Sequence, residues 1–146
     1  MSDEATPAAT EAGEDETPPL GTVTVRTMAM PRDANWLGDI FGGWLMSHAD
    51  VAGGILAYQQ AGGKVVTVAV NEFLFLKPVY VGDVVSCYTS LLRVGRTSLR
   101  IAVDIRVDRP GCQLPVPLQV ATACITYVHV GEDRRPRPIA KDGQQS

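Results

Sequence analysis

A short stretch of the sequence gathers residue types that can carry out chemistry. It reads Asn35-Trp-Leu-Gly38-Asp-Ile-Phe-Gly42-Gly43, and Asp50 follows within an otherwise apolar segment. If this segment is helical, the positions one turn away from Asp50 hold Met, Ser and two glycines, so no base neighbours the acid. Such a carboxylate either lies on an exposed strip of helix or is retained for function, and its position alone leaves both open.

The glycine pair at the expected start of this helix is a second candidate feature. Gly42 and Gly43 would let a ligand approach the backbone, and the unpaired N–H groups of a first helical turn can stabilise a developing oxyanion. Attack on a carbonyl carbon requires such a group. The same pair can instead simply shape a tight junction between loop and helix. Asp39, just before the helix, is a candidate N-cap.

The elements that would position these residues follow from hydrophobic periodicity. Alternation predicts a strand over residues 21–30 that stops at Pro31, followed by a polar loop over 32–39. Residues 41–61 predict a helix that ends at the glycines 62 and 63. Because this helix is apolar on nearly every face, we expect protein to surround it.

Four further segments predict strands and define the fold class. They are residues 64–76, 83–93, 97–108 and 118–130. The turns at Val81-Gly82-Asp83 and Gly95-Arg96 are short, which favours antiparallel neighbours, and a proline-rich loop over 109–117 precedes the last strand. We expect an α+β domain in which one antiparallel sheet wraps a single long helix. One sheet covers only one side of the helix, so a second copy of the chain is the expected cover for the other side.

The bulk composition limits the class of protein. With 146 residues, 45% of them hydrophobic, the chain suits one globular domain. Its three cysteines, Cys87, Cys112 and Cys124, are widely spaced and odd in number, which argues against a zinc site and a disulfide framework. No apolar run approaches the roughly 20 residues needed to cross a bilayer. We therefore expect a cytoplasmic protein with no metal, no cofactor and no membrane partner.

Acidic residues are concentrated at the N-terminus. Residues 1–20 hold six acids and no base, and their composition predicts a disordered tail. Removing these six from the 16 acids leaves ten against 13 Lys and Arg, a mildly basic body that suits an anionic small ligand but does not indicate nucleic acid. We expect the domain to cover residues 21–140, with the part from Glu132 onward only loosely attached. Residues 141–146 are expected to form a flexible C-terminal tail.

Several of these motifs resemble one known family. The pattern Asn35-x-x-Gly38-x-x-x-Gly42-Gly43 with Asp50 is similar to that of the YciA-like acyl-CoA thioesterases, which have the hotdog fold. The resemblance extends from about Val25 to Ile139. It is carried, in order, by Arg26-Thr-Met-Ala-Met-Pro, Gly38-Asp-Ile-Phe-Gly-Gly-Trp-Leu-Met-Ser, Val65-Val-Thr-Val-Ala-Val, Leu76-Lys-Pro, Val81-Gly-Asp-Val-Val and Val94-Gly-Arg-Thr-Ser.

The resemblance implies roles for the residues of the first motif. Asp50 would be the general base or the nucleophile in hydrolysis of an acyl-CoA thioester. Asn35 would orient the attacking water or hold the thioester, and the backbone N–H of Gly43 would bind the carbonyl oxygen. Asn35 and Asp50 of one site would come from different subunits of a homo-oligomer built from dimers, possibly a trimer of dimers.

The resemblance also implies a substrate groove. Gly42 would lie against the substrate, and Thr67 and the segment Arg96-Thr97-Ser98 would line the CoA groove. Arg96 is a candidate phosphate contact, although a solvated turn arginine is an equally good interpretation of the sequence alone. The chain departs from the family pattern at Trp36-Leu37, whose bulk beside Asn35 could alter acyl preference.

Two other functions compete with thioester hydrolysis. A hotdog hydratase needs a histidine paired with an acid, and the chain offers His48 and His129, neither in a hydratase-like setting. A non-catalytic acyl-CoA sensor is the alternative from another class, but such regulators usually carry a DNA-binding extension, and the extension here is acidic. His48 stands two residues from Asp50 and so points to another side of the helix.

Overall fold

The computed structural model describes residues 17–140. Most of the expected acidic tail, residues 1–16, and all of the expected C-terminal tail, residues 141–146, lie outside the described residues. The last four residues of the expected N-terminal tail are described, and the carbonyl of Thr17 accepts a hydrogen bond from the guanidinium of Arg106 at 2.6 Å.

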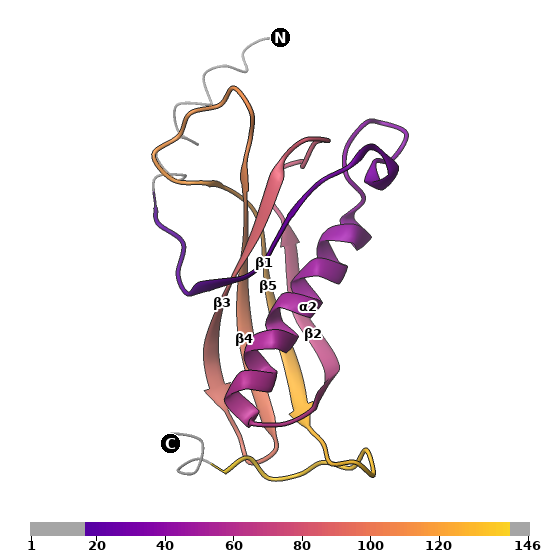
Figure 1. The fold of residues 1–146 in the computed structure, drawn as a ribbon, viewed down its shortest axis with the longest axis vertical. Coiled ribbons are helices and arrows are strands. Elements are labelled where there is room, and N and C mark those ends of the chain that lie inside the picture. The colour runs from indigo at the N-terminus through magenta and orange to yellow at the C-terminus, as the bar shows by residue number, and fades with distance from the viewer. Residues whose placement is uncertain (1–16, 141–146) are drawn as a thin grey trace.

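One helix packs against one face of a five-stranded antiparallel sheet (Figure 1). In chain order the elements are β1 (Thr22–Met28), the 3₁₀ turn η1 (Pro31–Asp33), α2 (Gly42–Ala61), β2 (Val65–Phe75), β3 (Val84–Val94), β4 (Ser98–Asp108) and β5 (Leu118–His129). The expected α+β class and the expected hotdog arrangement of a sheet around one long helix are confirmed. The polar loop differs in one respect, because its first residues form η1.

The order of strands in the sheet is β1-β3-β4-β5-β2. β3 and β4 form a hairpin through the Gly95-Arg96 turn, as expected. The expectation of a hairpin at Val81-Gly82-Asp83 is wrong, because β2 pairs with β5 at the opposite edge. The connection after β2 instead runs back toward β1, where the N–H of Gly82 donates to the carbonyl of Ala29 at 2.8 Å.

Small residues on one side of α2 allow the helix to lie close to the sheet. Ala49, Ala52, Gly53 and Ala57 are buried there, against inward-facing side chains of the central strands. The helix ends as expected at Gly62, which has φ 75°, a left-handed conformation that favours glycine. This close packing fixes which helical residues face the sheet and which remain on the outside.

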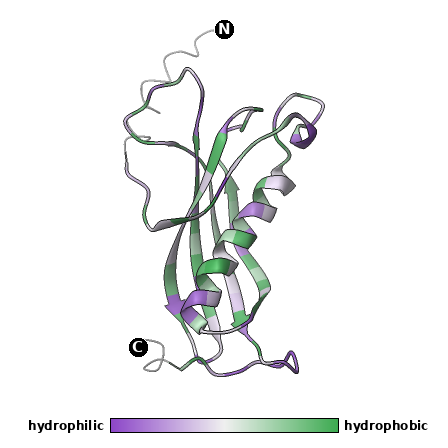
Figure 2. Ribbon diagram, viewed as in Figure 1, coloured by the Kyte–Doolittle hydropathy of each residue, from purple (hydrophilic) through white to green (hydrophobic). Residues whose placement is uncertain are grey.

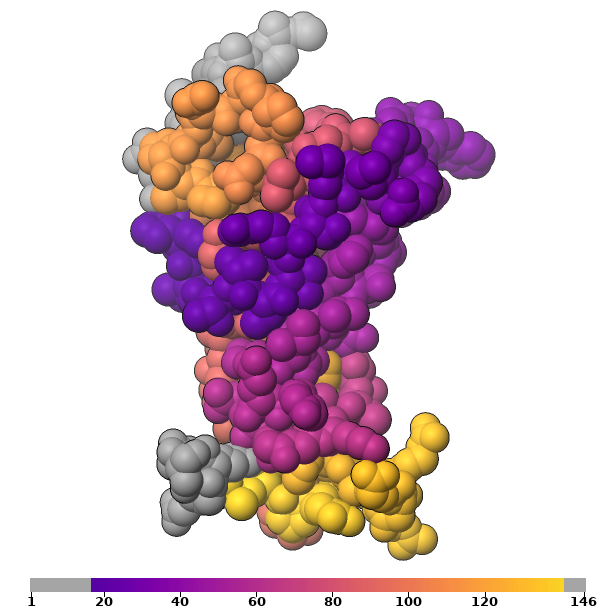
Figure 3. Space-filling view, in the orientation of Figure 1, coloured from indigo at the N-terminus to yellow at the C-terminus, as the bar shows by residue number. Residues whose placement is uncertain are grey.

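The outward side of α2 is apolar and uncovered within one chain. Val51 is 54% exposed and Tyr58 57% exposed. Figure 2 shows hydrophobic residues along the helix, which lies in front of the sheet in that view. In Figure 3 the magenta spheres of α2 form the surface of this face, with no other described segment over their middle part. The exposed residues of α2 are thus mostly apolar in its middle, whereas Gln59 and Gln60 are exposed at its end, and the expectation that a second chain covers this face stays a prediction.

Strand β2 is a second uncovered apolar element. None of its residues is buried, and one of its edges has no partner strand among the described residues. Its exposed apolar side chains are Val66, Val68, Val70, Leu74 and Phe75. An exposed, hydrophobic edge strand is a surface on which another chain readily pairs.

The segment after β5 is held more firmly than its sequence predicts. From Val130 it folds back along the end of the sheet, and the N–H of Arg137 donates to the carbonyl of His129 at 2.8 Å. Ile139 is 6% exposed, and its N–H donates to the carbonyl of Arg96 at 2.8 Å. The expectation that residues from Glu132 onward are held loosely is therefore wrong up to about residue 140. Backbone hydrogen bonds and the buried side chain of Ile139 attach this charged segment to the domain.

Candidate active site

Asp50 lies in the third turn of α2 and is held by groups from two strands. Its Oδ1 accepts a hydrogen bond of 2.7 Å from the hydroxyl of Thr67 on β2. The hydroxyl of Tyr127 on β5 lies 3.2 Å from the same oxygen. Thr67 and Tyr127 are direct cross-strand partners in the sheet, so one rung of the β2–β5 ladder presents both hydroxyls to the helix.

Tyr127 is the residue of this site that the sequence did not reveal. It is 1% exposed, and its hydroxyl also donates to the main-chain carbonyl of Asp50 at 2.7 Å. Burial, and next the negative charge and hydrogen bond of Asp50, raise the pKa of Tyr127, so its hydroxyl stays protonated as a donor. The available signal was a tyrosine at an inward position of an apolar strand, because a buried phenol needs a hydrogen-bond partner.

The loop before the helix is stiffened by the side chain of Asn35. Its Oδ1 accepts hydrogen bonds from the N–H of Leu37 at 2.8 Å and of Asp39 at 3.1 Å. Gly38, at φ 94°, closes the turn with an N–H bond of 3.0 Å to the carbonyl of Asn35. With Oδ1 occupied, the amide nitrogen is the group that Asn35 can offer to a ligand.

The first turn of α2 carries the two glycines. The N–H groups of Trp44 and Leu45 bond to the carbonyl of Phe41, at 3.1 and 3.4 Å. Those of Gly42 and Gly43 precede the first intrahelical donors, at the positive end of the helix dipole. The expectation that Asp39 caps this helix is wrong. Phe41 is the N-cap, without a side-chain cap, whereas Asp39 pairs through its backbone with Tyr80.

The two glycines have different surroundings. A Cβ at Gly42 would lie 3.0 Å from the ring of Phe75, so this position is limited by packing. A Cβ at Gly43 would meet nothing within 4 Å. A groove of about 380 Å³ borders this end of the helix, lined among others by Asn35, Gly42 and Phe75. Gly43 itself is not part of the lining, but the space around it leaves its backbone accessible.

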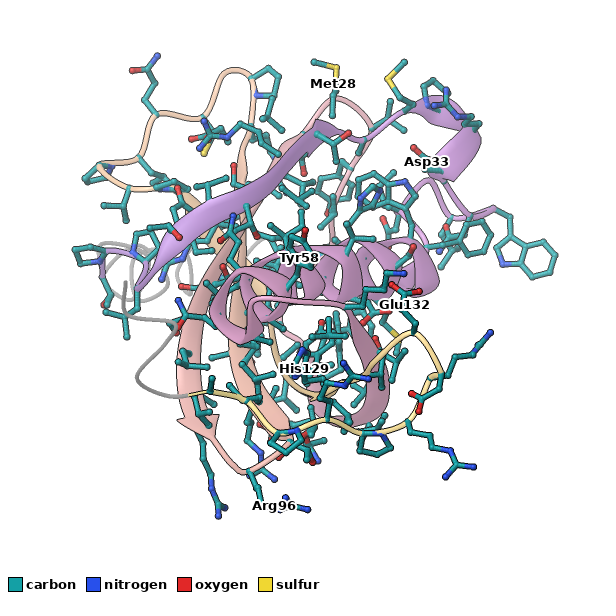
Figure 4. The ribbon with its side chains drawn as sticks, turned by 60° about the horizontal axis from the view of Figure 1, so that its bottom comes forward. Met28, Asp33, Tyr58, Arg96, His129 and Glu132 are labelled. Atoms are coloured by element: carbon teal, nitrogen blue, oxygen red, sulfur yellow. The ribbon has the colours of Figure 1, made fainter. Side chains whose placement is uncertain are left out.

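A larger groove follows the second half of α2. It has a volume of about 920 Å³ and starts at Val51, directly after Asp50. Tyr58 of the helix and Val66 of β2 line its length. Lys64, Glu132 and Arg134 line its charged end, where Lys64 and Glu132 form a salt bridge of 3.1 Å. Figure 4 labels Tyr58 on the helix and Glu132, both of which line this groove. The groove thus runs from an apolar wall next to Asp50 to charged groups beyond the C-terminal end of the helix.

The Arg96-Thr97-Ser98 segment lies far from the helix N-terminus. It forms the β3–β4 turn, at the opposite end of the molecule from η1, and Arg96 extends into solvent (Figures 1 and 4). Its backbone contacts the end of β5, because the carbonyl of Thr97 accepts a hydrogen bond from the N–H of His129 at 2.8 Å. Within one chain this segment does not meet Asp50.

The predicted site residues therefore form three groups in one chain. Thr67, which we expected to line the CoA groove, donates a hydrogen bond to Asp50. Asn35 and the glycine pair lie at the start of the helix, and the Arg96 turn lies at the other end. His48 packs its ring against Trp44, with centroids 4.3 Å apart, and is a helix-surface residue as expected.

Metal-binding clusters, membrane-spanning helices and reactive cysteines would indicate other functions in residues 17–140. This part of the chain holds no cluster of His, Cys, Asp and Glu suited to a metal ion, and none of its helices could span a membrane. Cys87 is buried, and burial raises the pKa of its thiol to about 12, so the reactive thiolate is scarce at neutral pH.

Comparison with known proteins agrees with the motifs. Residues 37–112 match the family model described as the thioesterase superfamily. The acyl-CoA thioester hydrolase YciA of Salmonella typhimurium is 44% identical over 86% of this chain and 95% of its own length. The chain belongs to the thioesterase superfamily. The resemblance to YciA-like acyl-CoA thioester hydrolases is thereby confirmed.

Solved structures of this superfamily have the same fold. A hexameric broad-specificity acyl-coenzyme A thioesterase, HI0827, aligns with a TM-score of 0.81 at 44% identity, over 88% of each chain. The hexameric thioesterase y2039 of Yersinia pestis aligns with a TM-score of 0.79 at 44% identity, over 84% of this chain and 98% of its own. Both of these thioesterases are described as hexamers.

Proposed function

We propose that this chain is a cytoplasmic acyl-CoA thioester hydrolase, with residues 21–140 as its catalytic domain. The observation that carries the proposal is the placement of Asp50, a partly buried carboxylate held by two hydroxyls of the sheet, on a helix whose first turn is open at Gly43. The names of the relatives supply the substrate class. Both grooves touch this helix, so a ligand can reach its two ends.

In the proposed reaction the C–S bond of the thioester is cleaved by water. Asp50 either removes a proton from the attacking water or attacks the carbonyl carbon itself, forming an anhydride that water then opens. In both routes the carbonyl oxygen gains negative charge, which the N–H of Gly43 stabilises. The CoA sulfur leaves and takes up a proton, and the products are the carboxylic acid and free CoA.

We further propose that a complete site needs two chains. Asn35 belongs to a loop before the helix, whereas Asp50 lies about 12 Å along it by helical rise. An antiparallel partner helix would bring the Asn35 loop of one chain to the Asp50 of the other, and it would cover the apolar faces of α2 and β2. The hexameric relatives support an assembly of such dimers.

Substrate binding follows from the same arrangement. Gly42 and Thr67 would border the thioester, and Arg96, Thr97 and Ser98 of a neighbouring chain would contact the CoA moiety. An arginine at a turn, free of ion pairs in the described residues, suits a phosphate.

Release of free thiol from a panel of purified acyl-CoAs tests the proposed function. Asp50→Asn should fold but hydrolyse acyl-CoA at least ~100-fold more slowly, the scale on which a positioned base or nucleophile acts. Asp108→Asn is the matched control, because it neutralises an exposed carboxylate at the end of β4. Near-normal turnover by Asp50→Asn would remove this residue from the mechanism, and no turnover by the unaltered chain on any acyl-CoA would refute the function.

A further inference from the structure

The two carboxylate oxygens of Asp50 have unequal surroundings. Oδ1 lies 2.7 Å from the Thr67 hydroxyl and 3.2 Å from the Tyr127 hydroxyl. Among the described residues, Oδ2 has no such donor. A carboxylate rotates easily about its last side-chain torsion, so donors concentrated on one oxygen decide which oxygen faces the open side.

Tyr127 reaches the helix only because glycines stand opposite its ring. A Cβ at Gly53 would collide with the Tyr127 hydroxyl and would lie 3.1 Å from two ring carbons. At Gly54 a Cβ would lie 3.6 Å from the ring, an ordinary contact. Glycine weakens a helix interior, so its presence at Gly53 is explained by the close approach of the phenol.

The Tyr127 hydroxyl is tied to both the main chain and the side chain of one residue. It is 2.7 Å from the carbonyl oxygen of Asp50, its closer acceptor, and 3.2 Å from Oδ1. It is buried from water, and the pKa shift described above keeps it protonated. The hydroxyl therefore fixes the position of the Asp50 backbone within the helix and limits the movement of Oδ1.

We propose that Tyr127 is a positioning residue for hydrolysis, which together with Thr67 holds Oδ1 of Asp50 so that Oδ2 faces the thioester or the attacking water. This inference rests on the proposed function. It adds which carboxylate oxygen of Asp50 reacts and which hydroxyl groups orient that carboxylate. Tyr127 itself does not touch substrate, because it is buried between sheet and helix.

Tyr127→Phe is the first test, since it removes one oxygen and keeps the ring. The matched control is Tyr88→Phe, which removes a hydroxyl from the other face of the sheet, between the inward residues Cys87 and Thr89. We expect Tyr127→Phe to lower kcat about tenfold with KM unchanged, because a misaimed carboxylate slows the chemical step and leaves binding intact. Tyr88→Phe should change neither constant.

Gly53→Ala is the second test, because its methyl group would displace the Tyr127 hydroxyl. It should lower kcat as Tyr127→Phe does. In the double variant Gly53→Ala with Tyr127→Phe, the loss of kcat should be no larger than in the worse single variant, since both act through the same hydroxyl. Multiplied losses would show that the two residues act independently and would overturn the inference.

Other outcomes separate this inference from the proposed function. Unchanged kcat per correctly folded Tyr127→Phe enzyme would overturn the inference, even if the melting temperature fell, because the residue would then only stabilise the fold. A raised KM with unchanged kcat would also overturn it. If the unaltered chain hydrolysed no acyl-CoA, the proposed function would fail, and this inference with it.

Discussion

Asp50 takes its hydrogen bonds from the neutral hydroxyls of Thr67 and Tyr127. A salt bridge to Lys or Arg would orient the carboxylate too, but it would also offset the negative charge that the proposed reaction uses. Hydroxyl donors orient it without a compensating cation. This choice of partners distinguishes the acid from the structural carboxylate of Asp83, which is 1% exposed and paired with Arg109 at 2.8 Å.

The four glycines in α2 differ in their surroundings. Each glycine in a helix interior costs about 1 kcal/mol relative to alanine. Gly53 admits Tyr127, Gly54 contacts the same ring, and Gly42 lies against Phe75. A side chain at position 43 would meet no neighbouring atom within 4 Å. Packing within the chain therefore does not explain why this residue is glycine.

The open position of Gly43 yields a prediction at the residue scale. Gly43→Ala should keep or slightly raise the melting temperature, because alanine favours the helix, yet lower kcat/KM at least ~10-fold by placing a methyl group beside the proposed oxyanion donor. Steady-state kinetics and thermal melting measure both effects. Gly42→Ala is the comparison, in which contact with Phe75 should affect stability first. Wild-type kcat/KM in Gly43→Ala would place the carbonyl oxygen elsewhere.

At the scale of elements, the loop before α2 presents two large apolar side chains to solvent. Trp36 is 99% exposed and Leu37 80% exposed. The loop keeps its shape through hydrogen bonds of Asn35 to the backbone, which do not need either side chain. Two exposed apolar residues on a stiff loop are explained if they contact a partner chain or a ligand.

The second prediction concerns this loop. Replacing Trp36 and Leu37 with Ala should change the ranking of kcat/KM among short and long acyl-CoAs, by the ~1 to 3 kcal/mol that apolar pocket contacts discriminate. The loop backbone should persist because Asn35 is kept. A panel of acyl-CoAs of different chain length provides the measurement. A uniform fall across the panel would show that the side chains position the loop and do not select the acyl group.

At the scale of the whole molecule, one chain leaves two apolar surfaces uncovered, the outer side of α2 and strand β2. They adjoin each other, because β2 follows the helix after a short turn and lies at the sheet edge. Contiguous apolar surface of this kind marks an interface in a soluble protein. The same surfaces carry Thr67 and border Asp50, so assembly and catalysis would share them.

The third prediction tests whether two chains form each site. Asn35→Ala and Asp50→Ala should each be inactive, but after unfolding and co-refolding in equal amounts activity should return to about one quarter of wild type. About half of the dimers are then mixed, and one of the two sites in each is intact. Thiol release gives the activity, and mass-tagged chains verify the exchange.

A structural control is needed because Asn35 also holds its own loop. Asn35→Asp keeps an acceptor for the N–H groups of Leu37 and Asp39 while it removes the amide donor. It should complement Asp50→Ala in the same way. Verified mixed dimers without recovered activity for either Asn35 variant would contradict a site shared between chains.

The sequence by itself determined the elements and the resemblance. Period-two and helical patterns located the helix and all five strands to within about two residues at most ends, because they depend on neighbouring residues. The motif of Asn35, Gly43 and Asp50 pointed to the proposed chemistry through its resemblance to the YciA-like thioesterases. Local patterns also failed where they were ambiguous, since the short Val81-Gly82-Asp83 turn lies between β2 and β3, which are not neighbours in the sheet.

Tertiary structure alone decided which residues meet. Thr67 and Tyr127 reach Asp50 because the register of β2 and β5 places them on one rung beneath the third turn of the helix. Neither periodicity nor spacing encodes this register, which depends on strand order, on the bulges in β2 and on the glycine that admits the phenol ring. A hydroxyl 77 positions away in sequence thus became a partner of Asp50. Contacts across a sheet are fixed by packing of the whole domain, and no local stretch of sequence contains them.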